Sequence, residues 1–130
     1  MKQSMFQEKY PVFTVELGKD ETTGTSVDAI IDFLKARIAE HPAAVYIGVF
    51  DHYAHTKSLP DGEIAPEILD AKNLIFCFGT KLPNPGVLAV RPRSIGITEL
   101  ADKFIITFME APMPMANQAM ESWVNALKNK

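Results

Sequence analysis

Two histidines and an aspartate stand close together in DHYAH, residues 51–55, directly after the apolar run VYIGVF. Histidine titrates near neutral pH, so His52 could act as acid or base on a bound ligand, with Asp51 as an orienting carboxylate. His52 and His55 could bind one metal ion only if a bulge or turn brought them together, because an extended strand would point them to opposite faces. We favour the plainer interpretation, in which Asp51 caps a turn and His52 is a hydrogen-bonded residue at a strand end.

Two arginines, Arg91 and Arg93, flank Pro92. They could form a clamp for a carboxylate or phosphate, because a guanidinium group pairs bidentately with such groups and alternate residues share a face. The alternative, which we favour, is an exposed loop in which the arginines are solvated or paired with a glutamate. The candidate partners are Glu63, Glu67 and Glu99.

The other residues that could do chemistry have simpler explanations. Cys77 lies inside LIFCF, where a thiol usually behaves as a small buried hydrophobe rather than a nucleophile. The segment LPNPG, residues 82–86, predicts a turn and lacks the Lys-Ser/Thr ending of a phosphate-binding loop. We therefore predict no catalytic residue, no metal site and no cofactor. The candidate ligand-binding residues are His52, Arg91 and Arg93.

The spacing of apolar residues predicts two main helices. Val27, Ile30, Ile31, Leu34 and Ile38 form one helical stripe, in a helix that should end near His41 because Pro42 cannot continue it. The second stripe lies near the C-terminus and predicts a helix that packs on a sheet. Its members are Met120, Trp123, Val124 and Leu127.

Five further segments read as strands from their alternating or continuous apolar residues. They are residues 10–17, 44–55, 74–79, 94–100 and 103–111. The predicted order is thus β-α-β-β-β-β-α, and most of the connections are too short for a parallel crossover. We predict an α+β fold, a two-layer sandwich of a mostly antiparallel sheet with both helices packed on one face.

The stretch from Phe50 to Asn84 resembles the core of the family catalogued as domain of unknown function 302. The resemblance rests on Asp51-His52 at a strand end, Gly62 in the following connector and Phe78-Gly79 at the end of the next strand. It extends loosely over residues 12–127. It implies an α+β fold and homodimerisation, and it implies no established reaction.

Length and composition limit the function classes. The chain has 130 residues and fits a single domain, residues 1–130. It has one cysteine, no apolar run long enough for a signal peptide or a membrane span, and a net charge of −3 without a dense basic patch. We therefore expect a cytoplasmic protein that binds neither nucleic acid nor a membrane.

The expected function is that of a homodimeric module that binds a small ligand or partner and catalyses nothing. Dimerisation through the sheet or its edges is expected because both faces of the strand pair 94–111 carry apolar residues, which two helices are too few to cover. The segment 82–93 is an alternative cover within one chain. The alternative function is an enzyme acting on a small anionic substrate, with His52 as acid or base and Arg91 and Arg93 as the anion clamp.

Overall fold

The computed structural model describes all 130 residues and contains one six-stranded sheet in the order β1-β2-β6-β5-β4-β3, in which every neighbouring pair is antiparallel. The strands are β1 (Lys2–Phe6), β2 (Tyr10–Gly18), β3 (Ala44–Phe50), β4 (Asp70–Phe78), β5 (Arg93–Glu99) and β6 (Lys103–Met109). The helices are α1 (Val27–Glu40), α2 (His52–Ser58), the 3₁₀ helix η1 (Pro85–Ala89) and α3 (Pro114–Asn125). The predicted α+β fold with a mostly antiparallel sheet is confirmed.

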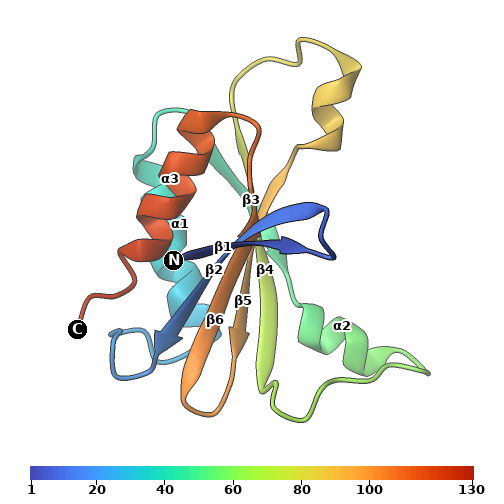
Figure 1. Ribbon diagram of the computed structural model, residues 1–130, viewed down its shortest axis with the longest axis vertical. Helices are drawn as coiled ribbons and strands as arrows, with labels where there is room; N and C mark the ends of the chain where they lie inside the picture. The colour runs from blue at the N-terminus through green and yellow to red at the C-terminus, as the bar shows by residue number, and fades with distance from the viewer.

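The hydrophobic core lies between one face of the sheet and the helices α1 and α3, which Figure 1 shows side by side on that face. Along β6, Phe104, Ile106 and Phe108 are buried, while the residues between them point to the opposite side. All five residues of the predicted apolar stripe of α1 are buried. The predicted packing of two helices on one face is therefore confirmed.

Local sequence explains where α1 begins and ends. The Ser26 hydroxyl accepts a hydrogen bond from the Ala29 amide at 3.0 Å, which satisfies one of the free N–H groups of the first turn. The helix ends at Glu40, and His41 adopts an extended conformation just before Pro42. This is the end that the proline predicts.

The predicted strand over residues 44–55 is too long, because β3 ends at Phe50 and the histidines belong to α2. The physical reason is the side chain of Asp51, which accepts a hydrogen bond from the Ala54 amide at 2.9 Å and so caps a new helix. The interpretation of Asp51 as a capping residue is confirmed. His52 and His55, three residues apart, lie within reach of each other on a helix instead of diverging along a strand.

The predicted order of elements also lacks β1, which pairs only with β2 at the edge of the sheet. Every residue of this strand is exposed, so its sequence KQSMF carries no alternating apolar pattern. The hairpin turn that joins it to β2 places Gln7 and Glu8 at φ 51° and 61°. Residues other than glycine rarely adopt this left-handed backbone conformation, so the turn is mildly strained.

The face of the sheet opposite α1 and α3 is not covered by a long helix, and we call it the open face. In Figure 1 the short α2, the segment around η1 and the tip of the β1–β2 hairpin lie toward this side. Its central side chains are half-buried and mostly small or polar. They include Thr14, Asn73, Ser94, Gly96, Thr98 and Thr107.

We predict that Trp123→Ala lowers the free energy of unfolding by about 3 to 5 kcal/mol, the usual cost of removing a buried aromatic side chain. The Trp123 ring is 6% exposed, stacks on Phe78 at 5.7 Å and meets the edge of Phe76 at 5.6 Å. Urea unfolding measures the change. Met115→Ala, in the same helix but 41% exposed, is the control and should cost well under about 1 kcal/mol. A comparably small loss for Trp123→Ala would contradict the packing described here.

Candidate functional site

The largest concave feature of the open face is a groove of about 540 Å³. Its floor is formed by side chains of three neighbouring strands, β4, β5 and β6. Its walls come from the β1–β2 hairpin and the end of β6, and from the last residue of η1 and the residues after it. The floor residues are Asn73, Ser94, Gly96 and Thr107, and the wall residues include Phe6, Val12, Val90 and Met109. We call it the open-face groove.

The floor of the groove carries a short chain of hydrogen bonds. The Asn73 amide nitrogen donates to the Ser94 hydroxyl at 3.1 Å, and its oxygen lies 3.3 Å from Nδ1 of His52. Because an amide oxygen can only accept, His52 must donate from Nδ1 in this contact. Thr107 donates to the Phe13 carbonyl at 3.1 Å. The floor is therefore polar and fixed in orientation, beneath apolar walls.

Gly96 keeps the middle of the floor low. A Cβ atom at this position would lie 3.4 Å from the Thr107 methyl group and 3.6 Å from the Asn73 amide nitrogen. These are ordinary contacts, so a larger side chain would fit the strand and rise into the groove. The absence of a side chain thus leaves room for a ligand at the centre of the open face.

Arg93 is the only charged residue among the groove's lining residues. Its Nη1 donates to the Val90 carbonyl at 3.3 Å, and its Nη2 donates to the Met109 carbonyl. Its Nε is buried and has no acceptor, and no carboxylate forms an ion pair with it. Burial lowers the pKa of the Arg93 guanidinium, because desolvation disfavours the charged form. Arg93 leaves β5 on the same side as the buried Ile95 and Ile97, so its guanidinium lies toward the helix-covered face and not over the groove floor.

Arg91 lies beside Arg93 but does not line the groove. Both arginines line a small cavity of about 30 Å³ near Phe78 and Met113. Arg91 donates to the Lys81 carbonyl at 2.7 Å and so holds the segment after β4 in position. Neither arginine pairs with any of the three glutamates that the sequence suggested, and Glu99 instead binds Lys19 at 2.7 Å. Both arginines border this cavity, and the guanidinium group of each donates to backbone carbonyls.

His52 is exposed in the first turn of α2 and does not line the groove. It lines a separate pocket of about 200 Å³ between α2 and residues 63–68. The His52 and His55 rings lie 6.3 Å apart, and both contact Phe50. The chain brings no third histidine, cysteine or carboxylate to them as a metal ligand. His52 reaches the groove only through its contact with Asn73.

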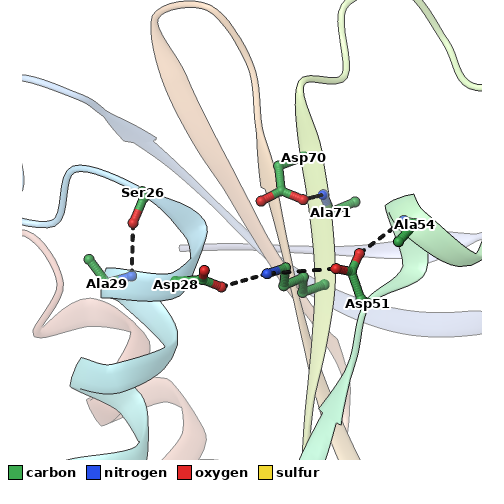
Figure 2. A network of polar contacts seen from close by, with 8 residues as sticks. Ser26, Asp28, Ala29, Asp51, Ala54, Asp70 and Ala71 are labelled. Atoms are coloured by element: carbon green, nitrogen blue, oxygen red, sulfur yellow. Dashed lines mark hydrogen bonds and ion pairs between the residues drawn. The ribbon is translucent and has the colours of Figure 1, made fainter.

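A second polar cluster links strand β4 to the starts of helices α1 and α2, as Figure 2 shows. Lys72 of β4 lies between Asp28 in the first turn of α1, at 2.6 Å, and Asp51, the capping residue of α2, at 3.7 Å. The hydrogen bond to Asp28 raises the pKa of Lys72, against the opposing effect of partial burial. The cluster positions the start of α2 and with it His52.

One family model, described as a family of unknown function (DUF6858), matches residues 1–129. The chain belongs to this family. The resemblance to the family catalogued as domain of unknown function 302 is therefore wrong, because the model of a different family matches the chain over residues 1–129. A search of the curated proteins and a search of the solved structures each found no significant match. None of the helices has both the length and the apolar character needed to cross a membrane.

The sequence did not predict the open-face groove. Asn73, Ser94 and Thr107 are common polar residues that stand far apart in the chain, and only the strand order β6-β5-β4 brings them together. The only sequence signal for these residues is that each of the three apolar strands carries a polar residue at a position that points away from the core. Of the three predicted ligand-binding residues, the structure places only Arg93 against the groove.

We predict that Lys72→Met lowers the free energy of unfolding at neutral pH by about 0.2 to 1 kcal/mol, the range of partly exposed ion pairs. Because the pKa of Lys72 is raised above 10.5 in the folded protein, this stabilisation is present at neutral pH. It should disappear as the pH rises through that pKa. Urea unfolding of both proteins at neutral and at strongly alkaline pH measures the difference. Lys57→Met in α2 is the control, because Lys57 has no ion-pair partner. A loss of unfolding free energy for Lys72→Met that stays the same at alkaline pH would contradict the ion pair as its cause.

Proposed function

We propose that this protein is a homodimeric module that binds a small ligand in the open-face groove and catalyses no reaction. The observation that carries the proposal is the groove itself, a concavity of about 540 Å³ over an otherwise uncovered sheet face. Apolar walls and a few fixed polar groups are the usual composition of small-molecule sites. Asn73, Ser94 and Thr107 supply the polar groups, while Phe6 and Val90 supply apolar surface.

The proposed dimer rests on the edge strand β3. Its sequence AVYIGVF contains no charged residue, and Val45 and Ile47 are 64% and 56% exposed. Native proteins usually protect such an edge with charges or cover it, because unpaired strands associate. A second copy in antiparallel orientation would meet no like charge along this strand. The β-bulge between Tyr46 and Gly48 interrupts a regular ladder, so side-chain packing would contribute more than backbone pairing.

The alternative of an enzyme that acts on a small anionic substrate has less support. It needs His52 as acid or base beside the Arg91 and Arg93 clamp, whereas His52 lines the pocket next to α2 and the arginines line other cavities. Arg93 alone borders the groove. Turnover of any compound that binds the groove, lost on His52→Ala, would favour the enzyme over the binding module.

A screen of small metabolites by thermal shift tests the ligand proposal. A compound present at a hundred times its Kd should stabilise the protein by about 2.7 kcal/mol. Gly96→Val should abolish the shift, because its methyl groups would fill the centre of the groove. Gly48→Val is the matched control, a strand glycine with no atom within 4 Å of an added Cβ, and should leave the shift intact. Equal shifts in both variants would place the ligand outside the groove.

Light scattering tests the dimer. The chain has a mass of 14.4 kDa, so we expect twice this mass at micromolar concentration. Ile47→Lys should return the mass to that of one chain, because a buried unpaired charge would oppose association at β3. Leu82→Lys, at a residue that is 73% exposed in a loop, should leave the dimer intact. A wild-type mass of 14.4 kDa would show that the chain does not dimerise.

A further inference from the structure

We propose that the ligand of the open-face groove is an uncharged, largely apolar molecule whose polar group is a hydrogen-bond acceptor, such as the carbonyl of a ketone or an ester. This inference rests on the proposed function, because it assigns a ligand class to the same groove. Two features carry it: the absence of charge above the groove floor, and the direction in which the floor side chains present their polar atoms.

The groove has no charged group above its floor. Arg93 is the only charged residue of the lining, and its side chain leaves β5 on the same side as the buried Ile95. An ion that entered the groove would lose part of its hydration without gaining a counterion. This loss costs more than the desolvation of a neutral polar group, so the groove favours an uncharged ligand.

The centre of the floor presents two hydrogen-bond donors. Asn73 and Ser94 both point to the open face, because the residue that follows each of them is buried in the core. The Asn73 amide nitrogen lies beside the empty space above Gly96, 3.6 Å from the place of an added Cβ atom. This nitrogen uses one of its two hydrogens on the Ser94 hydroxyl, which keeps its own hydrogen. One N–H and one O–H group are thus free to donate to a ligand oxygen.

The amide oxygen of Asn73 and the hydroxyl of Thr107 are turned away from this centre. The amide oxygen lies 3.3 Å from Nδ1 of His52, at the side of the floor toward α2. The Thr107 hydroxyl donates to the Phe13 carbonyl at 3.1 Å, and its methyl group faces the space above Gly96 at 3.4 Å. A ligand at the centre therefore meets donors from β4 and β5 and a methyl group from β6. An acceptor on the ligand fits this position better than a donor.

The rest of the groove suits an apolar body. Phe6, Val12 and Met109 line the side toward β1 and β2, beyond the Thr107 methyl group. Phe6 and Met109 are 61% and 49% exposed, so a ligand laid over the floor would cover apolar surface that the chain leaves in water. Burial of that surface would add affinity that depends on the length of the apolar body.

Three probes with the same eight-carbon chain separate acceptor, anion and cation: 2-octanone, octanoate and octylamine. Their dissociation constants are measured by NMR titration of the intact protein at neutral pH, followed at the backbone amide signal of Gly96. We expect 2-octanone to bind at least about tenfold more tightly than either ion, because neither ion finds a counterion in the groove. Binding of 2-octanone should not depend on added salt.

Variants of Asn73 test the donor. Asn73→Leu removes the N–H group at similar size and should weaken 2-octanone binding about two- to tenfold, the worth of one hydrogen bond. Asn73→Asp replaces the donor with a carboxylate and should reverse the selectivity, so that octylamine binds more tightly than 2-octanone. This reversal can be measured even if Asn73→Leu does not fold. Thr98→Val is the control, because it removes a hydroxyl group from the same face of β5 outside the groove lining, and it should change nothing.

The outcomes separate this inference from the proposed function. Octanoate that binds as tightly as 2-octanone and is blocked by Gly96→Val would overturn the uncharged class and leave the groove as a ligand site. Tightest binding of octylamine to the wild-type protein would also overturn the assignment, because it would show an acceptor at the centre of the floor. A preference for 2-octanone that persists in both Asn73 variants would show that Asn73 does not bind the carbonyl. Failure of all three probes to bind would count against both proposals.

Discussion

Burial of a single sheet face against two helices is the constraint on which the rest of the structure depends. The core is complete once α1 and α3 cover the face that carries Leu17, Phe76 and Ile106, all of which are fully buried. Nothing of comparable length is left to cover the second face, since α2 is a seven-residue helix at one corner. The second face must therefore be stable in contact with water, and its central residues are accordingly mostly small or polar.

The same constraint explains why the open face has a groove and the core does not. The core is filled by aromatic and aliphatic side chains in contact, as the stacking of Trp123 on Phe78 illustrates. On the open face the small floor residues lie below the taller side chains of the hairpin and of the segment after η1. A depression results wherever short side chains are framed by long ones.

The sequence allowed most of the core to be predicted and little of the site. The stripes of α1 and α3 were readable because burial of a helix face imposes a strict spacing on apolar residues. DHYAH was misread because a seven-residue helix has too few apolar positions to show that spacing, and Asp51 alone marked its start. Arg91 and Arg93 looked like a free pair because their acceptors, the carbonyls of Lys81, Val90 and Met109, belong to the backbone and leave no trace in residue types. Strand β1 has no buried side at all.

The pairing of β2 with β6 also affects how the chain can fold during synthesis. Val15 lies opposite Ile106, so these two neighbouring strands come from near the two ends of the sequence. Until β6 has left the ribosome, β2 has only the fully exposed β1 to pair with, and the apolar stripe of α1 lacks part of the surface that it will cover. Such long-range pairing slows folding and lengthens the time during which apolar surface is exposed. Apolar side chains of β2 and α1 thus stay exposed until residues 103–109 are available to pair with β2.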